Sequence, residues 1–254
     1  MKTIAIINQK GGVGKSTTAQ ALAAGLSLKG YKPLLIDLDP QCNTSFTAAC
    51  NNSPTITGLL LGEVSAQAAV QHTALGDIIA ASKALSGADT MITGTGREYR
   101  LKEALEPLQA VYDFAIIDTP PALGILTVNA LVAADTVIIP AQADIYSLQG
   151  IAALAETIRP VKKYCNAGLQ IAGILLTRFS PRSILSRDIA EQAEQAAAAL
   201  QTKVFKSTIR EAIAIKEAQI RQQSIFSYSP KSRVACDYSR FTEEFLDSLY
   251  STGK

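Results

Sequence analysis

The feature that most constrains this chain is a glycine-rich run with two lysines, residues 10–17, which reads Lys-Gly-Gly-Val-Gly-Lys-Ser-Thr. A short apolar segment, residues 3–7, precedes the run, and an alanine-rich amphipathic segment, residues 18–29, follows it. This order predicts a buried strand, a phosphate-binding loop and a helix. Glycines let the backbone wrap a phosphate with its N–H groups pointing inward, and a helix N-terminus favours negative charge. The run therefore indicates nucleotide binding. A simple glycine-rich turn is the weaker interpretation.

The side chains of the run suggest distinct tasks. Lys15 is placed to reach the β- and γ-phosphates, and the Ser16 hydroxyl is placed to ligate a magnesium ion. Lys10 is the unusual member, since a phosphate loop has no need of a second lysine at its start. The other residues expected to bind the nucleotide here are Gly11, Gly12, Val13, Gly14 and Thr17.

Length and composition favour one globular unit. With 254 residues, 48% of them hydrophobic and 18% charged, the chain can bury one large core, and we expect a single domain over residues 1–254. No apolar run reaches the roughly 18 residues that cross a bilayer, so we expect a soluble, cytoplasmic protein. The four cysteines form no Cys-x-x-Cys pair, which argues against a disulfide framework and against a zinc or iron–sulfur site.

Short apolar runs alternate with helical patterns along the chain. This alternation predicts an α/β fold, a doubly wound and mostly parallel sheet with helices on both faces. Ligands of such sheets bind at the carboxyl ends of the strands, where Lys10, Asp39 and Asp118 would meet. The expected strands are residues 3–8, 33–38, 78–80, 112–117, 136–140, 170–177 and 203–205. The expected helices are residues 17–29, 97–108, 124–133, 146–159, 185–200 and 235–249.

The two-lysine loop resembles the deviant Walker A motif, Lys-Gly-Gly-x-Gly-Lys-[Ser/Thr], of the ParA/MinD branch of P-loop ATPases. Residues 34–41, Leu-Leu-Ile-Asp-Leu-Asp-Pro-Gln, resemble the second strand and first switch of that branch. Residues 114–121, Phe-Ala-Ile-Ile-Asp-Thr-Pro-Pro, resemble its Walker B strand and second switch. Segments at 126–135, 174–179 and 229–233 extend the similarity over nearly the whole chain. Within the branch it is most similar to the Soj/ParA-type partition ATPases.

The resemblance implies a weak, Mg²⁺-dependent ATPase that releases ADP and phosphate. Phosphoryl transfer to water needs charge neutralisation, a metal and a positioned nucleophile. Lys15 would neutralise the phosphates. Ser16 would bind Mg²⁺ directly, and Asp118 would hold it through a water. Asp39 would orient the attacking water. We expect Asp37 to point to the opposite side from Asp39, as a carboxylate that caps a loop.

The resemblance also gives Lys10 a role in assembly. In a face-to-face homodimer its ammonium would reach the nucleotide of the other subunit, like an arginine finger supplied in trans. ATP would join two monomers and hydrolysis would release them. The adenine pocket is expected near Arg178 and Ile209. Residues 210–212, Arg-Glu-Ala, stand where family members often have Pro-Arg-Asn.

Charge is distributed unevenly. Residues 1–158 carry 9 Lys and Arg against 13 Asp and Glu, a balance of −4, whereas residues 159–254 carry 15 against 9, a balance of +6. A basic half suggests a polyanionic partner, either nucleic acid or a membrane surface, although basic side chains also solvate helix faces. Phosphate contacts carry no sequence information, so we expect nonspecific binding to double-stranded DNA. The candidate DNA contacts are Lys203, Lys206, Arg210, Lys216, Arg221, Lys231 and Arg233.

The function implied by the resemblance is plasmid or chromosome partition, in which ATP-bound dimers coat the nucleoid and a ParB-like centromere-binding protein stimulates hydrolysis. The alternative is a MinD-like membrane switch, which requires a basic amphipathic helix at the C-terminus. Residues 241–254 hold three acids and one terminal lysine, which favours a core-packing helix. A ligase on the same fold stays open as a third interpretation. The only histidine, His72, is expected on the solvent face of a helix.

Overall fold

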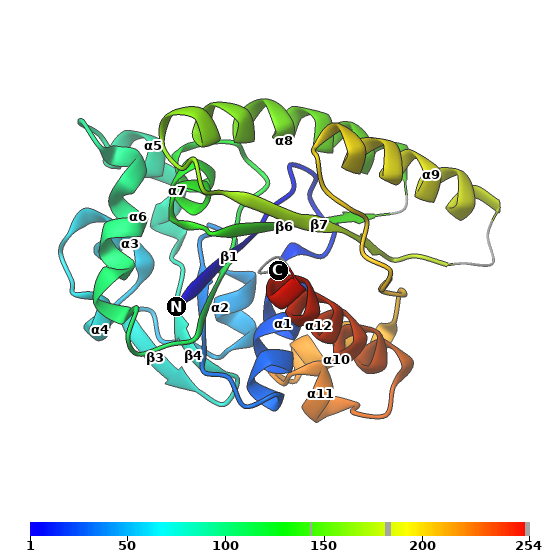
Figure 1. Cartoon of the computed structure of the whole chain (residues 1–254). Coiled ribbons are helices and arrows are strands. Elements are labelled where there is room, and N and C mark those ends of the chain that lie inside the picture. Colours follow the sequence, from blue (N-terminus) through cyan, green and yellow to red (C-terminus); the bar gives the residue numbers. More distant parts are fainter. Residues whose placement is uncertain (143, 181–183, 252–254) are drawn as a thin grey trace.

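The computed structural model describes residues 1–142, 144–180 and 184–251. Its centre is a seven-stranded sheet with the strand order β3-β4-β2-β5-β1-β6-β7 (Figure 1). Neighbouring strands are parallel except β3, which runs antiparallel to β4 at one edge. The strands are β1 (Lys2–Ile6), β2 (Pro33–Asp37), β3 (Val70–Thr73), β4 (Gly76–Ile79), β5 (Phe114–Asp118), β6 (Thr136–Gln142) and β7 (Gln170–Thr177). The predicted doubly wound, mostly parallel α/β fold is confirmed.

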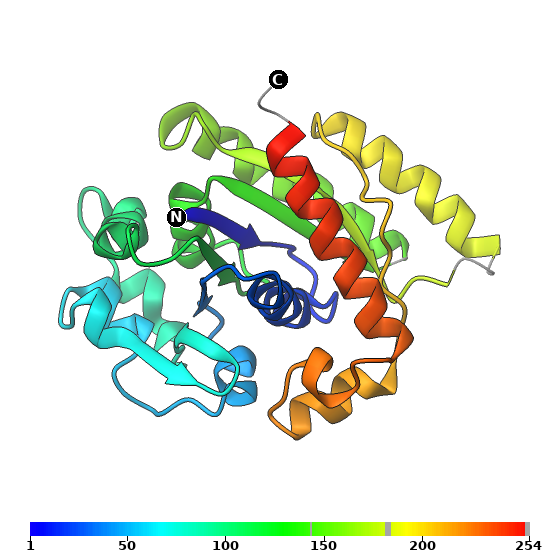
Figure 2. The ribbon, with the colours of Figure 1, turned by 60° about the horizontal axis from the view of Figure 1, so that its bottom comes forward.

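Helices cover both faces of this sheet. In the two views, α7, α8 and α9 lie on one face, and α1 and α12 lie on the other (Figures 1 and 2). The helices are α1 (Lys15–Leu28), α2 (Asn43–Thr47), α3 (Ile56–Leu61), α4 (Ala66–Ala69), α5 (Ala88–Met91), α6 (Arg100–Leu105), α7 (Ile125–Ala133), α8 (Ile145–Tyr164), α9 (Ile184–Ala199), α10 (Ile213–Ile220), α11 (Ile225–Tyr228) and α12 (Arg233–Ser251). Short 3₁₀ helices occur at Lys83–Gly87, Arg97–Tyr99 and Glu106–Leu108. None of the described helices combines the length and apolarity of a bilayer span.

The strand residues alternate between two apolar cores. Ile4 and Ile116 belong to the core that includes α1 and α12, whereas Ala5 and Ile117 belong to the core that includes α7 and α8. Strands buried on both faces read as continuous apolar runs, which explains why the sequence revealed most of them.

Charged residues end two of the central strands. Asp37 is the last residue of β2 and Asp118 is the last residue of β5, and the two are paired in register. Ile6, the last residue of β1, is in register with Asp118 on the other side. The loop that follows β1 therefore leaves the sheet next to Asp118, and Asp37 lies one strand further on.

The C-terminal helix α12 is a packing helix. Its Tyr238, Phe241 and Phe245 are buried, and the Phe241 ring meets Phe205 edge to face with the centroids 5.1 Å apart. This placement agrees with the core-packing helix that the sequence favoured.

Three expected elements differ. His72 lies on β3, not on a helix, although it is exposed as expected. Residues 203–205 form only an isolated bridge, Val204 to Ile174, because this segment runs along the outer edge of β7 without a full ladder. The helix expected over residues 97–108 is divided into two 3₁₀ turns and α6, and Pro107, which has no N–H to donate, lies in the last of them.

Candidate nucleotide-binding site

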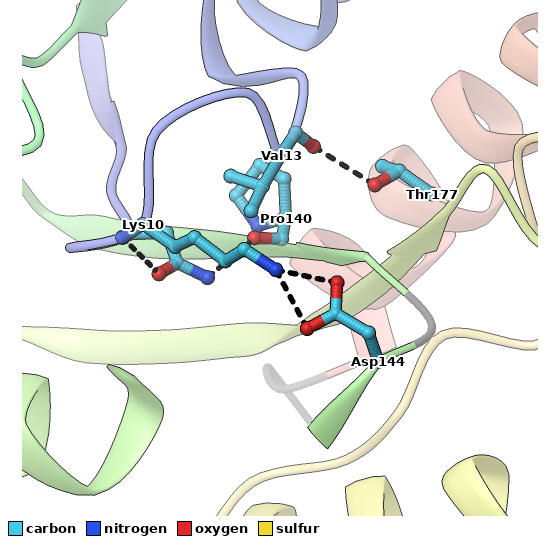
Figure 3. Close-up of polar contacts among 6 residues, drawn as sticks. Lys10, Val13, Pro140, Asp144 and Thr177 are labelled. Atoms are coloured by element: carbon cyan, nitrogen blue, oxygen red, sulfur yellow. Dashed lines mark hydrogen bonds and ion pairs between the residues drawn. The ribbon is translucent and has the colours of Figure 1, made fainter. Parts of the chain in front are cut away.

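The glycine-rich loop connects β1 to α1 in a conformation that needs its glycines. Gly12 and Gly14 have φ angles of +77° and +88°, which L side chains rarely adopt. A Cβ placed on Gly11 or Gly12 would meet no heavy atom within 4 Å, so this side of the loop faces open space. The Thr177 hydroxyl, at the end of β7, donates to the Val13 carbonyl at 2.8 Å and anchors the loop (Figure 3).

A cavity of about 580 Å³ opens in front of this loop. The loop contributes Gly11, Gly12, Gly14, Lys15, Ser16 and Thr17 to its lining. Asp39 reaches it from the segment after β2, Arg178 from the segment after β7, and Lys216 from α10. Val13 does not line this cavity. Its side chain is fully buried and borders a smaller hollow that Ile209 also lines.

Lys15 is nearly buried, with 7% of its surface exposed. Its ammonium donates to the Lys10 carbonyl at 3.2 Å. Burial lowers the pKa of Lys15, and the nearby carboxylates of Asp118 and Asp39 oppose that shift. The loop therefore holds one cation deep in the cavity next to two acids, and a phosphate group can serve as its counter-charge.

Asp118 is fully buried and only half satisfied. One carboxylate oxygen, Oδ2, accepts from the Thr44 hydroxyl at 2.7 Å. The other, Oδ1, has no hydrogen-bond partner among the described residues. Burial raises the pKa of Asp118 to about 7, and the charge of Asp37 adds to the shift, whereas contacts with Thr44 and Ser16 oppose it. A buried oxygen without a partner beside a serine hydroxyl fits a hydrated divalent cation.

Asp37 and Asp39 have different surroundings. The Asp37 carboxylate accepts from the Ser45 N–H at 2.8 Å, the Ser45 hydroxyl at 2.7 Å and the Asp39 N–H at 3.0 Å, so it caps the loop and the start of α2. Burial raises its pKa to about 6. Asp39 lines the cavity and accepts from the Gln41 N–H at 2.9 Å. Residues two apart on a strand share a face, so strand alternation does not separate them. They diverge because β2 ends at Asp37 and the chain turns.

Lys10 points elsewhere. Its ammonium lies 2.6 and 2.5 Å from the two carboxylate oxygens of Asp144, which stands between β6 and α8 (Figure 3). The backbone N–H of Lys10 donates to Asn8 Oδ1, and Asn8 Nδ2 donates to the Pro140 carbonyl at 2.7 Å. Asp144 was not predicted as a partner, because no local pattern links residues 134 positions apart.

The residues expected at the adenine pocket come together at the smaller hollow, of about 140 Å³, beside the loop. Arg178 and Ile209 both line it, and the Phe179 N–H donates to the Ile209 carbonyl at 3.0 Å. Arg210 also lines it, and its guanidinium binds the buried Asp237 of α12 through Nε and Nη2 at 2.6 and 2.8 Å. This pair holds the segment in which the chain departs from Pro-Arg-Asn.

The basic residues proposed for DNA have different surroundings. Lys203 lies over the Phe205 ring, 5.3 Å from its centroid, and Arg210 is engaged by Asp237. Lys216 lines the nucleotide cavity, whereas Arg221 lines a separate groove beside β3. The other members, Lys206, Lys231 and Arg233, are exposed.

Comparisons with known proteins point in one direction. A family model described as an AAA domain matches residues 1–171. The sporulation initiation inhibitor protein Soj of Bacillus subtilis is 38% identical over 96% of this chain and 97% of its own length. The chromosome partitioning protein ParA of Myxococcus xanthus is 37% identical over 96% of this chain and 88% of its own length. This chain belongs to the ParA/MinD family of P-loop ATPases.

A solved structure adds the ligands of a relative. Cobyrinic acid a,c-diamide synthase from Mycobacterium smegmatis, bound to an ATP analogue and magnesium, superposes with a TM-score of 0.86 at 33% identity, over 100% of this chain and 98% of the other. ATP and Mg²⁺ are the cofactors that this similarity supports, and we expect Lys15, Ser16 and Asp118 to hold them. Among the described residues, His, Cys, Asp and Glu form no group of three that could hold a metal by themselves.

Proposed function

We propose that this ParA/MinD-family ATPase is a partition ATPase of the Soj/ParA type, cytoplasmic and associated with the nucleoid. The observation that carries the proposal is the division of labour between the two loop lysines. Lys15 lies in the cavity with Asp39, whereas the Lys10 ammonium lies outside it on Asp144. An ATPase that acts alone needs only the first arrangement. The names of the full-length relatives, Soj and ParA, support the same function.

In the proposed reaction, the loop backbone and Lys15 hold the β- and γ-phosphates of ATP, and Asp39 accepts a hydrogen bond from the attacking water and aligns it with the γ-phosphorus. Magnesium, when bound, neutralises phosphate charge. Ser16 would hold it directly, and the free Oδ1 of Asp118 would hold it through a water. Deep burial of this carboxylate keeps solvent from competing for it.

In the proposed cycle, two ATP-bound subunits meet face to face and each Lys10 moves to the nucleotide of the other. The dimer binds double-stranded DNA of any sequence through exposed lysines and arginines of the C-terminal half. A ParB-like centromere-binding partner accelerates hydrolysis, which separates the subunits. The MinD-like alternative is less favoured because Phe241 and Phe245 of α12 are fully buried and unable to insert into lipid.

The deciding experiment compares DNA and membrane binding in one preparation. We expect ATP, and not ADP, to produce dimers by light scattering and retention on unrelated DNA duplexes at low salt. Lys15→Ala serves as the nucleotide-free control. Flotation with anionic liposomes and no retention on DNA would instead favour the MinD-like function. If the protein binds ATP but is retained neither on DNA nor on liposomes, the ligase alternative would be favoured. The similarity to the synthase described above points to that class of enzyme.

A further inference from the structure

One basic residue of the proposed DNA set lies at the nucleotide cavity. Lys216, on α10, lines the cavity in front of the glycine-rich loop and also the smaller hollow near Ile209. Within the described residues its ammonium has no hydrogen-bond or ion-pair partner, in contrast to Lys10 on Asp144 and Arg210 on Asp237. Lys216 is therefore a cation without a partner among the described residues, at the boundary between the nucleotide cavity and the smaller hollow.

The position of α10 is fixed by contacts at two points. The Gln219 side chain donates from Nε2 to the Thr17 hydroxyl at 3.2 Å, which ties α10 to the first turn of α1. Just beyond the helix, Gln222 donates to the Phe46 carbonyl of α2 at 2.9 Å. Lys216 and Gln219 are three residues apart and share a helix face, so the contact with Thr17 directs Lys216 toward the loop.

The boundary between the two hollows corresponds to the middle of a nucleotide. With the β- and γ-phosphates on the glycine-rich loop and the base beside Ile209, the α-phosphate and ribose fall between them. A lysine is a flexible point charge on a four-carbon stem and suits a phosphate oxygen. We propose that Lys216 binds the α-phosphate of the bound nucleotide in its own subunit, and that it does not belong to the DNA surface. The proposal deepens the function given above and rests on it for the identity of the nucleotide.

This assignment predicts a specific pattern of loss. The α-phosphate is common to ATP and ADP, so Lys216→Gln should weaken binding of both about equally, by about tenfold, as expected for one charged contact. Because the contact is the same before and during hydrolysis, KM should rise while kcat stays near that of the parent. Lys216→Arg should retain most of the affinity, since it keeps the charge.

The test measures dissociation constants for ADP and for ATP by fluorescence or calorimetry without DNA, with thermal melting as the check of folding. Lys102→Gln, an exposed lysine of α6, is the matched control for loss of one positive charge and should bind both nucleotides like the parent. DNA retention of Lys216→Gln is then measured at saturating ATP and should equal that of the parent.

Three results would overturn the assignment. Nucleotide affinity of Lys216→Gln within twofold of the parent would remove Lys216 from the site. Weaker binding of ATP by Lys216→Gln, with the affinity for ADP unchanged, would place the Lys216 contact on the γ-phosphate. Weaker DNA retention at saturating ATP, with normal nucleotide affinity, would return Lys216 to the DNA surface. If the parent itself fails to bind DNA, the partition function fails while the nucleotide measurements still decide the role of Lys216.

Discussion

The ammonium of Lys10 and the carboxylate of Asp144 form an ion pair with both N···O distances at or below 2.6 Å. Their side chains are 29% and 27% exposed. In the proposed dimer the same ammonium serves the nucleotide of the other subunit, so Asp144 competes with dimerisation. The ion pair is partly screened by solvent and contributes about 1 kcal/mol or less.

The first prediction concerns this pair. Lys10→Ala should remain monomeric with ATP while it still binds the nucleotide, because Lys15 and the loop backbone are unchanged. Asp144→Asn should dimerise at an ATP concentration a few-fold lower than the parent, because the competing charge is removed. Light scattering across an ATP titration measures both. Dimerisation of Lys10→Ala at parental ATP concentrations would rule out a role in trans.

The second prediction separates hydrolysis from binding. Asp39→Ala should retain ATP and magnesium, hydrolyse ATP at least about a hundredfold more slowly and accumulate as the ATP dimer, because the attacking water loses its acceptor. Phosphate release and light scattering follow the two effects. Parental turnover in this variant would exclude Asp39 as the residue that orients water.

The edge hairpin gives a third prediction. The Tyr112 hydroxyl donates to Asp77 Oδ2 at 2.8 Å, and His72 bonds the other oxygen at 2.6 Å. Partial burial raises the pKa of Asp77, but the hydrogen bonds from His72 and Tyr112 lower it, and the net effect is a pKa below the usual 3.8. The ionised form is therefore favoured in the folded state. Its stabilisation is present above pH 3.8 and is lost as the pH falls through the folded-state pKa.

Tyr112→Phe keeps the ring under Lys32 and removes only the donor. We expect about 1 kcal/mol lower free energy of unfolding at pH 7, and a smaller difference from the parent at pH 3. Urea unfolding at the two pH values measures it, and NMR titration of Asp77 should show a raised pKa. Parallel stability curves with an unmoved Asp77 pKa would contradict this account.

The sequence predicted the parts of the site that lie next to one another along the chain. The glycine-rich loop is local, and Asp39 and Asp118 each follow an apolar strand whose parallel neighbours bring them to one edge. The contacts made across the fold were not predictable. Asp144 meets Lys10, Thr44 meets Asp118 and Asp237 meets Arg210 across separations of 134, 74 and 27 positions in the sequence.

The missed elements have similar causes. Strand β4 was predicted, as residues 78–80, but its partner β3 was missed. Val70–Thr73 is a short edge strand with little apolar alternation, so His72 was placed on a helix. Net charge indicated a basic C-terminal half, but it could not show that Lys216 faces the nucleotide cavity. That distinction depends on the orientation of α10 against α1, which is a tertiary contact.

A fourth prediction tests how closely α12 packs on α1, the helix that follows the glycine-rich loop. A Cβ on Gly25 of α1 would lie 2.5 Å from Thr242 Oγ1 and 3.2 Å from its Cβ. Gly→Ala within a helix usually stabilises by roughly 1 kcal/mol. Here the clash should reverse the sign, and Gly25→Ala should cost about 1–3 kcal/mol in the free energy of unfolding. Thr242→Ala in the same chain should recover part of it. A stabilised Gly25→Ala would show that the helices separate easily.

The last prediction concerns DNA. The +6 balance of residues 159–254 includes Arg221, Lys231 and Arg233, all exposed and outside the nucleotide cavity. Binding through such residues releases counterions, so retention of the ATP dimer should fall steeply between 50 and 200 mM salt, values at which about 10³-fold or greater losses occur for proteins with several phosphate contacts. A dimer doubles the basic surface, which makes retention depend on ATP.

Changing the three residues together to Ala should weaken binding to unrelated duplexes equally and flatten the salt dependence, with ATP-dependent dimerisation intact. Electrophoretic shifts on two duplexes of different sequence measure this. Sequence preference in the parent, or unchanged retention in the triple variant, would place the DNA surface elsewhere.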